Sequence, residues 1–348
     1  MDISSGEINR IITEDKAGFH DEKEEILRVG LQVSKYIHVD DTGARHNGKN
    51  GYCTHIGNEL FACFESTESK SRINFLKILR AGRDDYVINP DAICYMEAQK
   101  LAQKELLKFS YLLNTAYENE QAWQEKLAAL DITKPRHIQI ATEGALLGSV
   151  IEHGFNTDMV IVSDDAGQFD ILLHALCWIH AERTINKLVG FNDKQITALE
   201  ESRSQIWEFY KELKKYKEFP GIKGKKQLNA RFDEIFTAKT CFATLNQALS
   251  RLYKNKAELL LVLERPDIPL HNNLSENDIR EYVKRRKISG SSRSSPGRRC
   301  RDTFTSLKKT CRKLGISFWN YLQDRLKNEN VVPYLPDQIG VRALEFFA

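Results

Sequence analysis

Long apolar segments are missing from this sequence. No run reaches the roughly 18 consecutive apolar residues of a transmembrane helix, and the start, MDISSGEINR, lacks the apolar core of a signal peptide. We therefore expect no membrane partner and a cytoplasmic location. The 41% hydrophobic and 28% charged residues are typical of a folded globular protein.

Paired cysteines are also missing. The seven cysteines are scattered, odd in number and include no CxxC pair. This pattern argues against a disulfide framework and against a clustered zinc site, and it predicts reduced thiols.

The chain as a whole has little net charge, but the charge is unevenly distributed along the sequence. The 51 basic and 48 acidic residues give +3. Between Glu276 and Lys313, however, 13 Lys and Arg stand against 4 Asp and Glu, a balance of +9 that leaves −6 for the rest. A basic segment on a mildly acidic body indicates a polyanionic partner.

The N-terminal quarter predicts helices followed by the start of a sheet. Ser4 or Ser5 can cap a short first helix. The next predicted elements are an amphipathic helix at 20–33, strands at 33–41, 52–56 and 60–65, a turn-like stretch at 43–51, and a helix at 71–79. Strands with such short links predict an antiparallel meander.

The remaining sequence mixes helical and strand-like segments. The predicted elements are a long helical stretch at 92–130, a strand HIQIA after Pro135, a helix at 144–153, the buried strand MVIVS before Asp164, a helix at 174–188, a charged helical pair at 193–264 interrupted at Pro220-Gly221 and Gly224, a helix from Asn273, a Gly/Ser/Pro/Arg loop at 290–299, and two helices split at Gly315. This order predicts an α/β core with helical insertions.

We divide the chain accordingly into six segments. They are an N-terminal helical segment at 1–33, two parts of the catalytic core at 34–90 and 136–190, helical insertions at 91–135 and 191–266, and a basic C-terminal region at 267–348.

Pairs of aspartates follow two of the predicted strands. Asp40 and Asp41 end the first strand, where only one of two neighbours can face a shared site, and Asp164 and Asp165 end the buried strand. Carboxylates at these strand ends lie where α/β proteins form ligand sites. Aspartates also simply cap and turn chain ends, so the residues alone leave both interpretations open.

Glu276 belongs to the inward face of its predicted helix, because it precedes Ile279 and Val283 by three and seven residues. One interpretation is a carboxylate that stabilises the helix N-terminus and pairs with Arg280. The other is a metal ligand beside a phosphate-binding surface. The same helix carries the basic run Lys284, Arg285, Arg286 and Lys287.

Three carboxylates suit metal-assisted chemistry on a phosphate backbone. Mg²⁺ and Mn²⁺ prefer oxygen ligands, and two such ions roughly 3.5–4 Å apart stabilise the attacking and leaving oxygens at phosphorus. Water or a DNA 3′-hydroxyl then attacks, so no nucleophilic side chain is needed.

Four segments together resemble the DDE transposases of the IS66 insertion-sequence family. They are VDDTGARHNGKNGYCTHIG, SDDAGQFD, CWIHAER and HNNLSENDIREYVKRRK, and the resemblance covers roughly residues 36–64 and 158–326. It implies an RNase H-like α/β fold with a mixed sheet. It also carries the family's catalytic, metal-binding carboxylates onto Asp40, Asp164 and Glu276, and so selects one aspartate from each pair.

The sequence departs from the family pattern in three places. Asn272 and Asn273 replace an Asp-Asn pair, and Ile279 precedes Arg280. The helical stretch 92–130 is not expected of a typical member. No cysteine cluster matches the family's zinc-binding N-terminal part, so we expect a truncated or split transposase with a separate N-terminal or accessory protein.

The resemblance and the local charge together predict a DNA-binding surface. Its candidate residues are His180, Arg183, Arg280, Lys284, Arg285, Arg286, Lys287, Arg293, Arg298, Arg299 and Arg301. For Arg183, a surface ion pair is an equal alternative.

Several other residues have a structural interpretation. His174, Cys177 and His180 are spaced as zinc ligands could be, but no fourth ligand is evident, and we expect Cys177 in the core. We also expect Trp319 and Tyr321 to pack in the core.

The resemblance implies a transposase that uses Mg²⁺ or Mn²⁺ to cleave transposon ends and to join the 3′-hydroxyl to target DNA. Self-association on DNA and a nucleoid location when bound follow from the resemblance. Two alternatives stay open. An RNase H-like nuclease or resolvase needs the same carboxylates but would not join strands, and a non-catalytic DNA-binding remnant would not need them.

Overall fold

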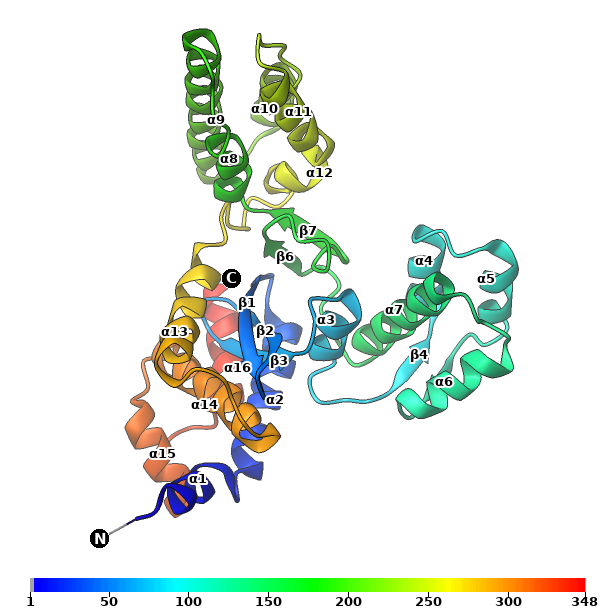
Figure 1. Ribbon diagram of the computed structural model, residues 1–348, viewed down its shortest axis with the longest axis vertical. Helices are drawn as coiled ribbons and strands as arrows, with labels where there is room; N and C mark the ends of the chain where they lie inside the picture. The colour runs from blue at the N-terminus through cyan, green and yellow to red at the C-terminus, as the bar shows by residue number, and fades with distance from the viewer. Residues whose placement is uncertain (1–2, 348) are drawn as a thin grey trace. The chain divides into compact units, whose positions relative to one another are not determined.

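The computed structural model describes residues 3–347 (Figure 1). It is a mixed α/β protein, as predicted, with one sheet in the order β3-β2-β1-β6-β7 and a second formed by β4 and β5. The strands are β1 (Tyr36–His46), β2 (Lys49–Gly57), β3 (Ala62–Thr67), β4 (Tyr86–Ile88), β5 (Thr115–Tyr117), β6 (Val160–Ser163) and β7 (Leu173–Leu176).

Helices form most of the remaining structure. They are α1 (Ser5–Thr13), α2 (Ala17–Val33), α3 (Arg72–Leu79), α4 (Pro90–Ala98), α5 (Gln103–Ser110), α6 (Glu120–Ala129), α7 (Pro135–Glu152), α8 (Trp178–Asn186), α9 (Asp193–Glu218), α10 (Ile222–Phe236), α11 (Ala243–Lys254), α12 (Lys256–Leu259), the 3₁₀ turn η1 (Leu261–Leu263), α13 (Asn273–Ser289), α14 (Ser295–Lys313), α15 (Phe318–Lys327) and α16 (Leu335–Phe346). Across residues 3–347, no helix is long and apolar enough to cross a membrane.

The chain divides into two compact units. Unit 1 comprises Met1–Ser34, Asp40–Met159 and Ser275–Ala348, and unit 2 comprises Lys35–Val39 and Val160–Leu274. The strand β1 thus contributes its first residues to unit 2 and the rest to unit 1. The six-segment division stays a prediction.

A tight hairpin joins β1 to β2 in unit 1. Asn47 and Gly48 have φ values of +49° and +75°, the type I′ geometry for which Asn-Gly is well suited. The predicted turn-like stretch at 43–51 is therefore wrong, since only these two residues turn and the strands continue on both sides. The next pair, β2 and β3, is antiparallel from Tyr52 opposite Thr67 to Gly57 opposite Ala62.

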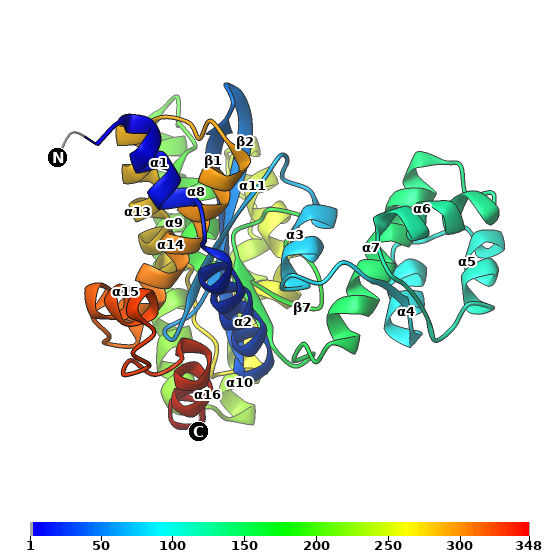
Figure 2. The ribbon, with the colours of Figure 1, turned by 90° about the horizontal axis from the view of Figure 1, so that it is seen from below.

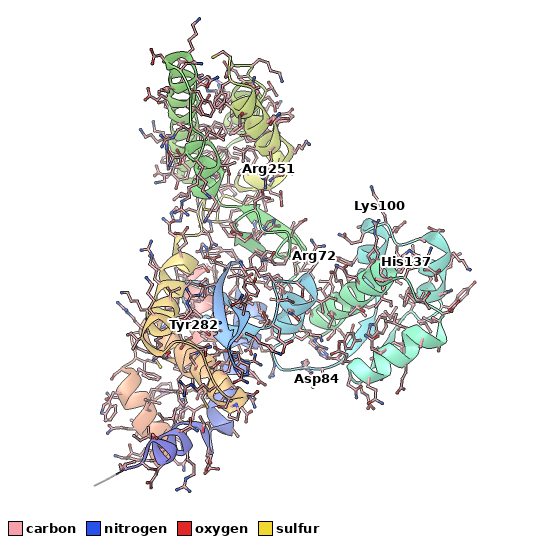
Figure 3. The ribbon with its side chains drawn as sticks, in the orientation of Figure 1. Arg72, Asp84, Lys100, His137, Arg251 and Tyr282 are labelled. Carbon is pink, nitrogen blue, oxygen red and sulfur yellow. The ribbon has the colours of Figure 1, made fainter. Side chains whose placement is uncertain are left out.

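The helix α13 covers one face of this part of the sheet. Its buried Ile279 and Tyr282 pack on Ala44 of β1, Cys53 of β2 and Phe64 of β3. Figure 3 labels Tyr282 on α13. The predicted inward stripe of this helix is confirmed.

The helix α14 closes the open edge of β3, the terminal strand of the sheet. The backbone N–H groups of Ala62, Phe64 and Ser66 donate to three side chains of α14. The acceptors are Thr310 Oγ1 at 3.2 Å, Ser306 Oγ at 2.8 Å and Asp302 Oδ2 at 3.0 Å. Edge donors that would otherwise be unpaired are satisfied in this way.

The predicted 290–299 loop is shorter than expected. Ser294 caps α14 by accepting from Gly297 N, and Pro296 lies in the first turn, where its missing N–H costs nothing. Arg298 and Arg299 are consequently helical. On α15, Tyr321 is fully buried as predicted, but the prediction that Trp319 packs in the core is wrong, since it is 66% exposed. Residues two positions apart in a helix point about 200° apart, so Trp319 faces solvent when Tyr321 faces the core.

At the N-terminal end of unit 1, Ser4 caps α1 and Ser71 caps α3. The helix α2 packs against α16 (Figure 2). Buried Glu22 of α2 accepts from Arg325 Nε and Nη2 at 3.0 and 3.1 Å, and from Leu335 N at 3.2 Å. These bonds tie the C-terminal helices to α2.

The predicted helical stretch at 92–130 is mostly helical, but it is divided into α4, α5 and α6, with the short strand β5 between α5 and α6. Residues with positive φ, Lys100 at +60° and Asn114 at +64°, separate α4, α5 and the short strand β5. The predicted strand HIQIA is wrong, because Pro135 starts the long helix α7 instead. Its alternating isoleucines span too few residues to distinguish a strand from the first turns of a buried helix.

Unit 2 contains the parallel strands β6 and β7 and the helices α8 to α12. The charged region at 193–264 forms α9, α10, α11 and α12 rather than one helical pair, and Gly224 lies inside α10 without breaking it. Trp178 of α8 packs on Phe209, Phe232 and Phe236, at centroid distances of 5.3 to 6.2 Å. Cys177 is buried, as expected.

Candidate functional site

Asp40 and Asp41 point to opposite faces of β1. Side chains alternate along a strand, so Asp40 shares the face of Ala44, which α13 covers. Asp41 faces the other side, where its Oδ1 accepts from Thr54 Oγ1 at 2.5 Å. Within unit 1, the strand geometry therefore distinguishes Asp40 as the aspartate on the same face as the Glu276 helix.

Glu276 is half-buried in the first turn of α13. Its neighbours fix this turn on β2: His55 Nδ1 lies 2.6 Å from Ser275 Oγ, and His55 Nε2 lies 3.2 Å from Asp278 Oδ2. Burial lowers the pKa of His55. Burial alone would raise the pKa of Asp278, but the nearby His55 and Lys313 outweigh it and hold that pKa well below its usual range.

Asp164 and Asp165 differ sharply in their surroundings. Asp164 follows the fully buried strand β6, and its Oδ1 is buried without a hydrogen-bond partner among residues 3–347. Asp165 is half exposed and pairs with Arg251 Nη2 at 2.6 Å (Figure 3 labels Arg251). An unpaired buried carboxylate oxygen is costly unless a cation or donor reaches it.

The β1–β6 ladder leads toward two of the predicted carboxylates. Tyr36 pairs with Val160 and His38 with Val162, in parallel. The paired residues end two positions before Asp40 on β1 and two positions before Asp164 on the β6 side. Asp40 and Glu276 belong to unit 1, and Asp164 belongs to unit 2.

Asn272 joins the end of this ladder to the start of α13. It is fully buried, its Nδ2 donates to the Val39 carbonyl at 2.7 Å, and its Oδ1 lies 2.9 Å from His38 Nδ1. Its backbone N–H also donates to Cys177 Sγ at 3.2 Å. The position that departs from the family pattern is thus a structural link between β1, α8 and the segment leading to Glu276.

A chain of hydrogen bonds reaches the backbone of Asp164 from within unit 2. Ser163 Oγ donates to the Asp164 carbonyl at 2.6 Å and lies 2.7 Å from His174 Nε2. His174 Nδ1 lies 2.6 Å from Glu258 Oε1 on α12. Sequence analysis missed Ser163 and Glu258, since no local pattern connects residues this far apart.

The sequence also suggested His174, Cys177 and His180 as zinc ligands. In the structure, the side chains that approach His174 closely enough to share an ion are Asp170 and Glu258. Cys177 Sγ instead accepts from Asn272, and His180 Nε2 lies 3.1 Å from Arg183 Nη1. His174, Cys177 and His180 therefore each contact different residues.

The predicted DNA-binding cations fall into two groups. Some have intramolecular partners: Arg285 donates to Thr305 at 2.9 Å, Arg286 donates to the Gly43 carbonyl, and Arg299 pairs with Glu24 at 3.2 Å. Others are exposed on α13 and the following loop, namely Arg280, Lys284, Lys287 and Arg293. Their contact with DNA stays a prediction.

Three lysines of α14, which are not among the predicted DNA-binding residues, form ion pairs with acidic residues of α13. Lys309 and Lys313 of α14 lie 3.2 and 2.8 Å from Asp278, and Lys308 lies 2.7 Å from Glu281. Part of the local charge excess is therefore neutralised inside unit 1.

The protein is a mixed α/β protein in which Asp164 directly follows β6, Asp40 lies within β1 rather than at its predicted end, and Glu276 lies in the first turn of α13. Residues 110–299, more than half of the chain, match the family described as "Transposase IS66 family". The chain is also 44% identical over 303 residues to "Uncharacterized protein y4jO" of Sinorhizobium fredii (strain NBRC 101917 / NGR234), covering 86% of this chain and 94% of that protein. The chain belongs to the IS66 transposase family. Asp164 and Glu276 lie inside the matched region, and Asp40 lies before it.

Proposed function

We propose that this protein is a DDE-type transposase, in which Asp40, Asp164 and Glu276 bind divalent metal ions for cleavage of transposon ends and strand transfer. The observation that carries the proposal is the buried Oδ1 of Asp164 after β6, which has no hydrogen-bond partner within residues 3–347. A divalent cation is a fitting partner for an anionic oxygen in that position.

The strand geometry supports the choice of Asp40. Within unit 1, Asp40 lies on the face of β1 that α13 covers, the same helix that carries Glu276. The three antiparallel strands followed by two parallel ones support an RNase H-like assignment of the sheet.

Mg²⁺ or Mn²⁺ fits the proposed ligands, because carboxylate oxygens are the donors that these ions prefer. When bound, the ions supply charge stabilisation for displacement at phosphorus. The chain itself contributes orientation. Asn272 holds the backbone of β1 next to Asp40, and His55 holds the first turn of α13 around Glu276.

The predicted partners follow from this chemistry. Transposon ends and target DNA would be bound through the exposed cations of α13 and the following loop, with self-association on paired ends. A separate N-terminal or accessory protein stays part of the proposal. A nucleoid-associated cytoplasmic location is expected for such an enzyme.

End cleavage in vitro with Mn²⁺ tests the assignment. Asp40→Asn, Asp164→Asn and Glu276→Gln should each lower the cleavage rate by at least about a thousandfold, because each removes a charged ligand that stabilises the transition state. Asp41→Asn and Asp165→Asn are matched controls and should retain cleavage within about tenfold. Wild-type rates for Asp164→Asn would show the catalytic assignment to be wrong.

The product of the reaction separates the two alternatives. A nuclease or resolvase would release hydrolysed ends without joining them to target DNA. A DNA-binding remnant would bind DNA but give no product, and the three substitutions would leave its behaviour unchanged.

A further inference from the structure

A basic hollow lies on unit 1, between the β1–β2 hairpin and α14. It has a volume of about 490 Å³ and is lined by Arg45 and Lys49 of the hairpin and by Arg298 and Arg301 of α14. Glu68 is the one acidic residue in its lining. With four basic side chains and one acidic side chain, the lining carries a net positive charge that favours an anionic ligand.

Arg301 shows that this site is built rather than merely solvated. Its side chain is only 12% exposed, and its Nε and Nη2 atoms are buried without a hydrogen-bond acceptor among residues 3–347. Asp302 Oδ1 lies 4.0 Å from Nε, which is too far for a hydrogen bond. Buried donors normally have acceptors, so an anion that reached this guanidinium group would satisfy two N–H groups that residues 3–347 leave unpaired.

The guanidinium group of Arg301 is also held in place. It stacks over the ring of Tyr282, with 5.1 Å from its central carbon to the ring centroid. Tyr282 is itself fixed, since its hydroxyl lies 3.1 Å from Ser66 Oγ and 3.2 Å from Asp302 Oδ1. A preorganised planar guanidinium with free N–H groups suits the two oxygens of a phosphate.

The dimensions and remaining lining indicate more than an isolated phosphate ion. Asn47, Asn50 and Tyr52 contribute amide groups and an aromatic ring to the same hollow. These groups can contact the sugar or base attached to a phosphodiester. We propose that this hollow binds a backbone phosphate of DNA, with Arg301 and Arg298 as its main ligands.

This inference rests on the proposed function only in taking DNA as the substrate. It places DNA on the hairpin and α14, a surface with no proposed metal ligand. Arg45 is oriented by its own Nη2 donating to the Gly48 carbonyl at 2.8 Å, so the Asn47-Gly48 turn would also shape the site.

The test measures DNA affinity of the full chain by fluorescence anisotropy, in EDTA, over a range of salt concentrations. Arg301→Met should weaken binding about tenfold and lower the slope of log K against log salt by about one. Arg298→Met, at a less buried position, should lower the slope in the same direction. Arg312→Met is the matched control, because Arg312 is exposed in the last turn of the same helix and outside the hollow.

Thermal unfolding of each variant shows whether it is folded, and Arg298→Met keeps the test valid if Arg301→Met unfolds. Unchanged affinity and slope for both pocket variants would overturn the proposal. So would thermal stabilisation of the wild type by inorganic phosphate that Arg301→Met abolishes, if DNA binding is unaffected. The hollow would then serve free phosphate.

Failure of the proposed catalytic function gives a different result. In that case Asp164→Asn has no effect on DNA processing with Mn²⁺, while the binding measurements in EDTA stand unaltered. Normal catalysis together with unchanged binding of the Arg301 and Arg298 variants would overturn only the phosphate site.

Discussion

Asn272 donates its side-chain N–H to the carbonyl of Val39 at 2.7 Å, which fixes the backbone immediately before Asp40. The same side chain faces His38, and the residues that follow it start α13 and lead to Glu276. The buried Asn272 side chain therefore holds the residue before Asp40, and its backbone directly precedes the helix that carries Glu276.

Replacing this amide by a carboxylate tests its role. Asn272→Asp should lower the free energy of unfolding by about 2–4 kcal/mol at neutral pH, because a buried anion would face the Val39 carbonyl without a proton to donate. The loss should shrink near pH 5, since burial favours the protonated acid, which can donate again. Urea unfolding at both pH values measures this. An Asn273→Asp control should change stability by less than about 0.5 kcal/mol, and equal losses for the two variants would contradict the proposed link.

Asp164→Asn should have opposite effects on stability and catalysis. In EDTA, the amide should raise the free energy of unfolding by about 1 kcal/mol, because it removes a charge where Oδ1 is buried and finds no partner in the described part of the chain. Saturating Mn²⁺ should raise the melting temperature of the wild type but not of this variant. Asp165→Asn weakens an exposed ion pair with Arg251 and an exposed hydrogen bond from Asn255, and should differ from wild type by less than about 1 kcal/mol. A clear loss of stability for Asp164→Asn in EDTA would mean that protein groups hold this carboxylate.

The hydrogen bonds from Glu258 through His174 to Ser163 should position Asp164. Ser163→Ala should lower the cleavage rate about 10- to 100-fold and raise the Mg²⁺ concentration needed for half-maximal rate, as is usual when a group that orients a metal ligand is removed. Ser163→Thr keeps the hydroxyl and should restore both values. Ser202→Ala, which removes another buried hydroxyl of unit 2, should leave the Mg²⁺ requirement unchanged. If Ser163→Ala reduced only stability, its role would be purely structural.

His20 should make the fold sensitive to mild acid. Burial, assisted by the charges of Arg299 and Lys23, lowers the pKa of His20 to about 4. The unfolded chain therefore takes up a proton near pH 6.5 while the folded one does not, so stability is full above that pH and declines as the pH falls toward 4. The loss should be about 2 kcal/mol in urea unfolding. His20→Gln should remove this component, and His137→Gln, labelled in Figure 3, should retain it.

Much of the sheet could be predicted from local pattern. The β-branched run before Asp164 and the alternation before Asp40 both indicate strands, and the structure buries both segments on both faces of the sheet. The pair Asn47-Gly48 is a strong hairpin signal and locates the turn between β1 and β2. The flanking Gly43 and Gly51 also suit turns, so the pattern alone does not fix the length of the turn.

The errors arise where tertiary packing overrides a short pattern. The segment HIQIA has a strand's alternation, yet Gly144 and Gly148 let α7 pack closely on Met96 and Val87, and every residue from Ile140 to Val150 of this helix is buried. Helix breaks at Lys100 and Asn114 depend on left-handed residues that composition does not reveal.

The site was predictable only in part for a similar reason. The end of β6 and the inward face of α13 identify Asp164 and Glu276 as candidates, but Asp40, which the sequence predicts at a strand end, lies within β1. The groups that orient them, such as His174 and Asn272, do so through residues distant in sequence. Arg301 looked like any other loop arginine until α14 placed it over Tyr282.

The three hydrogen bonds between α14 and the edge strand β3 limit where residues can be inserted into or deleted from this chain. Four helical residues rise about 6 Å and two strand residues about 6.8 Å, so Asp302, Ser306 and Thr310 keep pace with Ser66, Phe64 and Ala62. One inserted residue in α14 would rotate everything after it by about 100° and break the matching. Insertions and deletions should therefore be excluded from this helix, while single substitutions at its solvent-facing positions remain tolerated.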